Sequence, residues 1–484
     1  MLLKGIIFLS LFFSQVGYAV TPIENIDAMI SNMNFSPYYK ARNSKKKTVR
    51  VAVLDNGFTG YENEVGRSLP SNTQYWPGPK PIEQMEQDLN ANLDETHGLY
   101  MAQILNGLLT SGGRYLELEP ELHLMNARGY TNFAAAIEKT IELDVDIVIY
   151  SVVWEYGGNG DGRGFINEAV SRATDAGIIW LNMAGNFRNY MFSAPVRTGD
   201  NDWVQLPGPN NSVRFLCLRG HGRYFNQAEE KFEYQYANEN GNCKVRVVLS
   251  WNDFKDDVEK GTDKDLDLVV INDMFESDGT STLTQVETKA EVAPGKSRYP
   301  FEIVSAVVEP GEHFIRVKNR SRNFDSDDDF LRLTVSGDFI HLSDRTPNET
   351  LLPPADHPDV ITVGASDSAR GSGSYQHDKP DLFVDSFVVV QKSNEGIDRE
   401  DSDSETGENR VNVLGNFLEG YNEYEAYKGT SNSTAMMGAA VAAMMAFKPD
   451  INKKEIIGYY ESGPRYARPE KPRSFRLPDL EELR

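Results

Sequence analysis

Ser431 has a residue type and position that could carry hydrolysis by a nucleophilic serine. It is the third residue of the stretch GTSNSTAMMGAAVAAMM, residues 429–445. By itself this stretch also fits a small-residue helix that packs tightly in a core. A serine becomes a nucleophile only when a base takes its proton, and an anionic group must orient that base. A further donor must face the negative charge that develops on the substrate.

Three other residues fit these roles. Among the seven histidines, His97 differs because it precedes Gly98 and begins an amphipathic helical pattern. Asp55 ends the β-rich run VRVAVLDNG, and Asn186 follows the apolar run IIWLNMAG. In parallel α/β sheets, sites form outside the carboxyl ends of strands, where both residues are expected. Each also has a plain structural interpretation, as a helix-start histidine, a turn-forming aspartate and a turn-capping asparagine.

The elements around these residues predict an α/β fold. Short apolar runs alternate with helical patterns over residues 48–199, which indicates a parallel sheet flanked by helices. Residues 200–342 contain short β segments without a convincing amphipathic helix, as in an all-β sandwich or jelly roll. The α/β pattern resumes over residues 343–484. We therefore expect a β domain inserted into an α/β domain; the alternative is one large mixed domain.

The N-terminus predicts export. Residues 1–19 combine Lys4, a short apolar run and a small-residue cleavage pattern, as in a secretory signal peptide, and residues 20–47 form a short segment before the fold. The alternative is a buried N-terminal strand or helix. No stretch is apolar enough for a transmembrane anchor. We expect a periplasmic or extracellular protein, in which Cys217 and Cys243 form a disulfide instead of two buried thiols.

The order of the four motifs resembles the subtilisin-like serine peptidase family. VAVLDNG, THGLYMAQIL, NMAGN and GTSNSTA occur in that order, and the resemblance spans residues 48–195 and 345–462. It implies that Asp55 orients His97, the general base and acid, while Ser431 attacks and Asn186 stabilises the oxyanion. Family members hold substrate as an extended strand by backbone hydrogen bonds. The residues implied to line that groove are Ser151, Val152, Val153, Met183, Ala184 and Gly185.

Several positions depart from the family pattern. Ser433 and Ala435 stand where Ala and Pro usually follow the Gly-Thr-Ser motif. Val153 and Trp154 stand where the substrate-lining strand usually carries a glycine, so the primary pocket should differ in shape. The segment before Asp55 is too short for the folded propeptide of many members.

The inserted β region resembles the jelly-roll domains that accompany some subtilisin-like enzymes. Its carboxylates predict a structural calcium ion, because Ca²⁺ prefers oxygen ligands. The alternative is a solvated acidic edge. No cofactor is expected for the chemistry itself. The predicted calcium ligands are Asp253, Asp263, Asp265 and Asp267.

Together these features predict an exported serine endopeptidase that acts on polypeptides. The formal net charge of -23 argues against nucleic acid as a partner, and we expect a monomer. The alternative is a non-catalytic peptide-binding protein with a subtilisin-like fold, suggested by the altered substrate strand and the large insertion. A sugar or ester hydrolase finds little support, because no carboxylate pair and no Gly-x-Ser-x-Gly elbow is evident.

Overall fold

The computed structural model describes twelve stretches of the chain. They are residues 22–80, 96–110, 116–218, 222–226, 231–235, 242–271, 291–293, 296–297, 299–337, 339–391, 424–462 and 472–483. The predicted signal peptide lies outside the described residues. Within them, no helix combines the length and the apolar character needed to cross a membrane.

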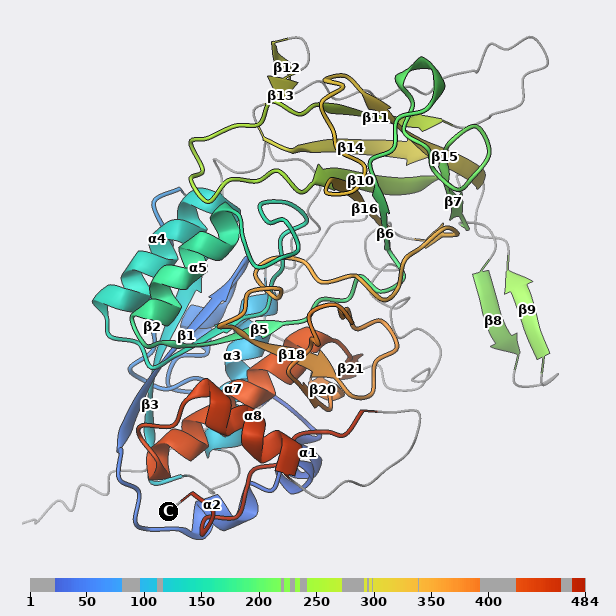
Figure 1. Ribbon diagram of the computed structural model, residues 1–484. Coiled ribbons are helices and arrows are strands. Elements are labelled where there is room, and N and C mark those ends of the chain that lie inside the picture. Colours follow the sequence, from blue (N-terminus) through green and yellow to red (C-terminus); the bar gives the residue numbers. More distant parts are fainter. Residues whose placement is uncertain are drawn as a thin grey trace, which may run out of the picture.

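A parallel sheet forms the centre of the α/β part (Figure 1). Seven described strands are ordered β19-β18-β5-β4-β1-β3-β2, and every pairing between them is parallel. The central strands are continuous apolar runs because both of their faces are covered. The strands are β1 (Thr48–Asp55), β2 (Gln74–Trp76), β3 (Glu119–Asn126), β4 (Ile147–Tyr150), β5 (Ile179–Met183), β18 (Ile361–Ala365) and β19 (Leu382–Val384).

Helices cover both faces of this sheet. On β1, Val51 and Val53 face the helices α3 and α7, whereas Ala52 and Leu54 face α4 and α5. The short helices α1 and α2 and the helix α8 join the first of these layers. The helices are α1 (Ile26–Asn32), α2 (Ser36–Lys40), α3 (His97–Thr110), α4 (Gly129–Glu142), α5 (Phe165–Asp175), α7 (Thr430–Phe447) and α8 (Lys453–Ser462), with short 3₁₀ turns at Tyr61–Asn63 and Asp200–Asp202.

The helix α7 is buried along its whole length. Its small residues are explained by the close approach of the helix to the sheet. A Cβ atom on Gly438 would lie 2.2 Å from Cδ1 of Ile149 on β4. The Ala- and Gly-rich sequence therefore lets the helix lie directly on the strands, and this packing determines where the helix begins.

Two antiparallel sheets pack against each other beyond the α/β part. Their orders are β14-β10-β16-β6 and β11-β15-β7-β17, and a separate apolar core lies between them. The fold class predicted from sequence, α/β with an additional antiparallel β region, is confirmed. The strands are β6 (Met191–Pro195), β7 (Val213–Cys217), β10 (Cys243–Trp251), β11 (Leu266–Ile271), β14 (Phe301–Val308), β15 (Gly311–Asn319), β16 (Phe330–Ser336) and β17 (Ile340–Leu342).

Short two-stranded ribbons complete the architecture. They pair β8 (Gly222–Asn226) with β9 (Lys231–Gln235), β12 (Glu291–Ala293) with β13 (Lys296–Ser297), and β20 (Val388–Gln391) with β21 (Tyr424–Tyr427). The domain boundaries stay a prediction. The strand β6 precedes the predicted boundary at residue 200, yet it pairs with β16 in an antiparallel sheet.

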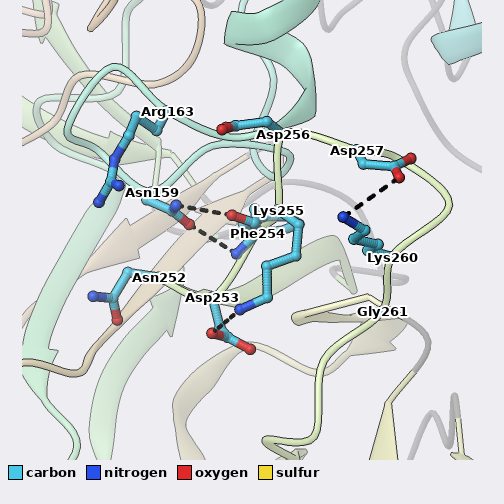
Figure 2. Close-up of a pocket in the computed structure, with 10 residues that line it drawn as sticks. All are labelled: Asn159, Arg163, Asn252, Asp253, Phe254, Lys255, Asp256, Asp257, Lys260 and Gly261. Atoms are coloured by element: carbon cyan, nitrogen blue, oxygen red, sulfur yellow. Dashed lines mark hydrogen bonds and ion pairs between the residues drawn. The ribbon is translucent and has the colours of Figure 1, made fainter.

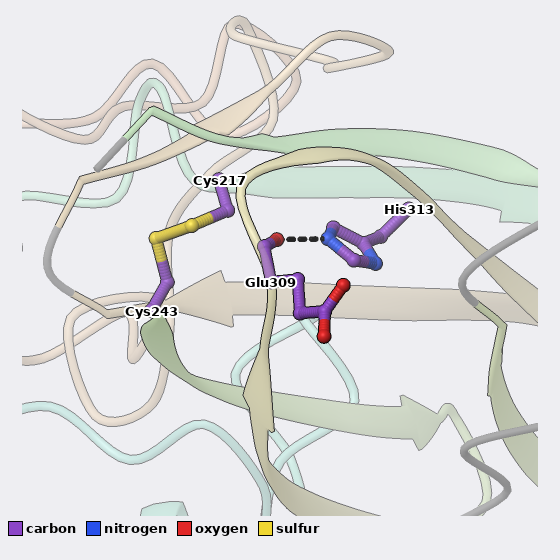
Figure 3. The surroundings of a disulfide bond; sticks show 4 residues. All are labelled: Cys217, Cys243, Glu309 and His313. Atoms are coloured by element: carbon purple, nitrogen blue, oxygen red, sulfur yellow. Dashed lines mark hydrogen bonds between the residues drawn. A yellow bond between two sulfur atoms is a disulfide. The ribbon is translucent and has the colours of Figure 1, made fainter. Parts of the chain in front are cut away.

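The predicted disulfide is present and joins the two antiparallel sheets. Cys217 ends β7 in one sheet, and Cys243 begins β10 in the other. Figure 3 shows the bond beside the edge of the sandwich, where Nε2 of His313 donates to the backbone oxygen of Glu309 at 2.7 Å. The bond is buried, with both cysteines 1% exposed. It therefore links the two sheets from inside their shared core.

Candidate active site

The candidate residues come from five segments that meet at the carboxyl ends of the parallel strands. The strand β1 pairs with β4, and β4 pairs with β5. Asp55 ends β1, Ser151 follows β4, and Met183 ends β5. His97 is the first residue of α3, and Ser431 is the second residue of α7. The topology thus places strand ends and helix starts together, as expected for a site in an α/β sheet.

The carboxylate of Asp55 contacts the imidazole of His97. Both carboxylate oxygens lie 2.9 Å from Nδ1 of the ring. The Asp55 side chain is fully buried, whereas that of His97 is 28% exposed. An ionised carboxylate only accepts hydrogen bonds, so Nδ1 must carry the proton. In the neutral ring, Nε2 is then the basic nitrogen.

Gly98 allows this contact. Its backbone N–H donates to the oxygen of Gly57 at 2.9 Å. A Cβ atom at this position would lie 2.6 Å from Cβ of Asp55 and 2.6 Å from Cε1 of Phe58. The helix α3 can therefore begin against the end of β1 only because residue 98 has no side chain.

A neutral tyrosine, Tyr150, lies close enough to Asp55 to feel its charge. Burial raises the pKa of Tyr150 well above its usual value, and the charge of Asp55 adds to this effect. The Tyr150 hydroxyl accepts a hydrogen bond from Nε1 of Trp154 at 2.7 Å. Tyr150 is therefore uncharged at neutral pH and adds no second negative charge near Asp55.

The Ser431 hydroxyl lies at the start of α7 and is weakly held. It is within 3.1 Å of Sδ of Met183 and 3.4 Å of the backbone oxygen of Ser151. A thioether is a poor acceptor, and the contact with oxygen is long. Ser431 is 8% exposed. The hydroxyl can therefore rotate away from these partners at little energetic cost.

Asn186 is hydrogen-bonded to Thr430, the residue before Ser431. The backbone N–H and the hydroxyl of Thr430 lie 3.3 and 3.4 Å from Oδ1 of Asn186. A backbone N–H only donates, so the amide oxygen must face Thr430 and the amide nitrogen must point the other way. The Thr430 hydroxyl also accepts from the backbone N–H of Gly185 at 3.2 Å. Sequence reasoning did not single out Thr430; its hydroxyl directly before the candidate nucleophile was the available signal.

The residues predicted to line the substrate groove divide into two groups. Val152 and Val153 are half-buried beside β4. Ala184 is fully buried, and its backbone N–H donates to Val363 at 2.9 Å, so that amide is already paired within the protein. Val152 and Val153, which follow β4, are therefore more accessible to a substrate than Ala184, which follows β5.

The predicted calcium ligands are engaged in other contacts. Asp253 pairs with Lys255 at 2.7 Å and accepts from Thr262 at 2.5 Å, while Asp267 pairs with Arg320. Across the residues that the structure describes, no three or more His, Cys, Asp or Glu side chains gather to hold a metal. Calcium binding stays a prediction that these contacts do not favour.

A polar hollow of about 730 Å³ lies away from the candidate triad. Figure 2 shows that the loop after β10 faces the loop after β4 across this hollow. Asn159 and Arg163 come from the second loop, and Asp253 and Lys255 from the first. The hollow mixes charges of both signs, and several of its carboxylates are paired locally. It therefore marks the junction between the α/β part and the antiparallel sheets.

A comparison with solved structures finds proteases of low sequence identity, with TM-scores below 0.5 for the three described here. Its sequence matches no protein-family model and no curated protein. The CspB protease of Clostridium perfringens is 11% identical, with a TM-score of 0.48 over 95% of this chain and 97% of that chain. The nisin leader peptidase NisP of Lactococcus lactis is 12% identical, with a TM-score of 0.38 over 94% and 92% of the two chains. The epidermin leader peptide processing serine protease of Staphylococcus aureus is 11% identical, with a TM-score of 0.40 over 94% and 79%.

Proposed function

We propose that the protein is an exported serine endopeptidase with a subtilisin-like Asp-His-Ser triad. The observation that carries the proposal is the contact between the buried Asp55 carboxylate and Nδ1 of His97. It lies at the carboxyl end of the parallel sheet, where Ser431 is the second residue of α7. A base oriented by a buried carboxylate and a serine in the first turn of a helix, both at the same end of the sheet, are groups that acyl transfer requires.

In the proposed reaction, Nε2 of His97 takes the proton as Oγ of Ser431 attacks the peptide carbonyl. Asp55 stabilises the imidazolium without taking the proton itself. The protonated ring then donates to the leaving amine, and water releases the acyl group by the same route. The Ser431 hydroxyl must first rotate away from Met183, which costs little because sulfur accepts weakly.

The oxyanion of the tetrahedral intermediate would accept a hydrogen bond from Nδ2 of Asn186. Two observations support this role. Thr430 holds the opposite atom of the amide, Oδ1, which directs the nitrogen outward. The N-terminus of α7 also favours negative charge, because its first backbone N–H groups have no partner within the helix.

Replacement of Ser431 by Ala tests the proposal. Casein hydrolysis should fall by roughly 10⁶-fold, as for other triad serines, and a serine-directed phosphonate should no longer label the protein. Ser433→Ala is the matched control. Ser433 lies two residues after Ser431 on the same helix, and its hydroxyl donates to the backbone oxygen of Val384. It should keep both activity and labelling. Equal labelling of the Ser431→Ala variant would refute the proposal.

Export and an oxidising compartment are part of the proposal. The sequence pattern over residues 1–19 and the buried Cys217–Cys243 disulfide support them, because such bonds persist outside the cytosol. The substrates are expected to be polypeptides that lie along the segment after β4.

A second candidate function is peptide binding without catalysis. It is favoured by the low exposure of Ser431 and by the contact of its hydroxyl with Met183 at 3.1 Å. A wild-type protein that resists the phosphonate but binds an extended peptide would favour this function over hydrolysis.

A further inference from the structure

The outer face of one antiparallel sheet packs against the loop that follows β4. On β10, Val245 and Val247 point into the core between the sheets, so Arg246 points to the other face. On β16, Leu333 and Val335 point inward, so Thr334 lies on the same outer face as Arg246. This face meets residues 154–164 of the loop between β4 and α5, which spans residues 151–164.

Glu155 is the residue of the loop that this face holds most directly. Nη1 of Arg246 donates to one carboxylate oxygen of Glu155, and the hydroxyl of Thr334 donates to the other at 2.5 Å. The side chains of Glu155 and Arg246 are only 14% and 21% exposed. A charged hydrogen bond with little access to water is stronger than one on the surface. Two neighbouring strands of one sheet therefore hold both oxygens of a single loop carboxylate.

Contacts on the C-terminal side of Glu155 extend the same interface. Tyr156 stacks on Phe301 of β14, with ring centroids 4.2 Å apart and planes at 16°. Asn159 exchanges two hydrogen bonds with the backbone of Phe254, at 3.0 and 2.8 Å (Figure 2). The loop is thus anchored on the antiparallel region at three successive places.

The N-terminal side of the same loop contacts the candidate nucleophile. The Ser151 backbone oxygen accepts from the Ser431 hydroxyl at 3.4 Å, and the backbone N–H of Trp154 donates to Pro353 at 2.8 Å. Only three residues separate Ser151 from Glu155. Consecutive Cα atoms lie at a fixed distance of about 3.8 Å from each other. A shift of Glu155 should therefore also move Val152 and Val153, because only a short piece of backbone joins them.

We propose that Arg246 and Thr334 are positioning residues for the substrate cleft. By holding Glu155, the sheet β14-β10-β16-β6 sets the path of residues 151–155, along which a peptide would lie. The inference rests on the proposed function only in taking a peptide as the ligand. The antiparallel region thereby positions the proposed peptide-binding segment, although it contributes none of the triad residues.

Amide hydrogen exchange of the whole protein tests this positioning without reliance on catalysis. In Arg246→Met, the amides of residues 152–156 should exchange about ten-fold faster, while those of β10 and β16 stay protected. The matched control is Arg214→Met, which removes an exposed ion pair with Glu312 elsewhere in the antiparallel region. Exchange of residues 152–156 that is no faster than in this control would overturn the proposal.

Kinetics and a double mutant supply the second readout. For extended peptides, Arg246→Met should raise KM about ten-fold and change kcat less than about three-fold. The reason is that a small misplacement of the binding segment weakens peptide binding. Glu155→Gln combined with Arg246→Met should be no worse than the poorer single variant, since both act through one contact. Fully additive effects would contradict the proposal.

The outcomes separate this inference from the proposed function. If wild-type protein resists the phosphonate, the proposed hydrolysis fails, and the exchange of residues 152–156 still decides the positioning role. If Arg246→Met does not fold, Thr334→Val serves instead, because it is close in shape and removes only the hydroxyl that reaches Glu155. Unchanged exchange of residues 152–156 in a folded Thr334→Val protein would then overturn the inference.

Discussion

Replacement of Gly98 by Ala should separate His97 from Asp55. The added Cβ would lie 2.6 Å from Cβ of Asp55 and 2.7 Å from the backbone oxygen of Gly57. Neither atom sits at the end of a flexible side chain, so the start of α3 must move. An ordinary contact begins at 3.4 Å, which requires a shift of about 0.8 Å.

This shift is large enough to break the contact that orients the base. Added to the present 2.9 Å, it takes Nδ1 of His97 to about 3.7 Å from the carboxylate, beyond hydrogen-bonding distance. A misplacement near 1 Å costs roughly 100-fold in rate. We therefore expect kcat/KM to fall by roughly 100-fold, or about 2.7 kcal/mol of transition-state stabilisation.

The effect on stability should be much smaller than the effect on rate. Overpacking costs about 1–3 kcal/mol, while Ala in place of Gly in a helix recovers about 1 kcal/mol. The net loss is about 0–2 kcal/mol, which urea unfolding followed by circular dichroism would measure. The control is Gly458→Ala in α8, where a Cβ would meet nothing within 4 Å. This control should unfold at the same or higher urea concentration and keep full activity.

Peptide hydrolysis and phosphonate labelling at neutral pH measure the loss of rate. Reduced labelling in a folded Gly98→Ala protein is the expected result. Wild-type kcat/KM in that variant would refute the reasoning, because it would mean that the Asp55–His97 contact is unnecessary or that the clash is absorbed elsewhere.

Three further predictions concern the base, the core and the central helix. Asp55→Asn should lower kcat by roughly 10⁴-fold with little change in KM, measured by steady-state peptide hydrolysis, because the amide favours the wrong tautomer of the imidazole. Burial lowers the pKa of His123 below 6.5, so the unfolded chain takes up the proton first as the pH falls. The free energy of unfolding should therefore decrease below about pH 6.5, whereas above that pH this group should have no further effect. Urea midpoints measured between pH 5 and 8 would show the decrease, and His123→Gln should flatten it. Gly438→Ala should destabilise the protein by about 1–3 kcal/mol in urea unfolding, because its Cβ would collide with Ile149.

Periodicity and residue type predict much of the architecture. Continuous apolar runs indicate strands covered on both faces, as in β4, and alternation along β10 and β16 indicates strands with one face in a core. Polar residues after strands and before helices indicate a common edge, because parallel strands all end on the same side. The Asp55–His97 contact and the Cys217–Cys243 bond follow from such local patterns together with the fold class.

The predicted calcium cluster shows what local patterns leave undecided. Alternation alone places Asp263, Asp265 and Asp267 on one side of an ideal strand, but β11 begins only at Leu266. Asp267 instead pairs with Arg320, which lies next to the adjacent strand. A carboxylate can meet a metal, an arginine or water, and the choice depends on residues that are distant in the sequence.

The sequence by itself therefore determined the element types, the edge of the sheet where polar residues gather, and the four residues with the types for acyl transfer. Tertiary structure alone decided that Thr430 holds the amide of Asn186, that Met183 lies against the Ser431 hydroxyl, and that Arg246 reaches Glu155. The physical reason is one of range. Strand and helix periodicities are set by neighbouring residues, whereas these contacts join residues 91 to 248 positions apart, whose meeting depends on how the packed sheets and helices fit together.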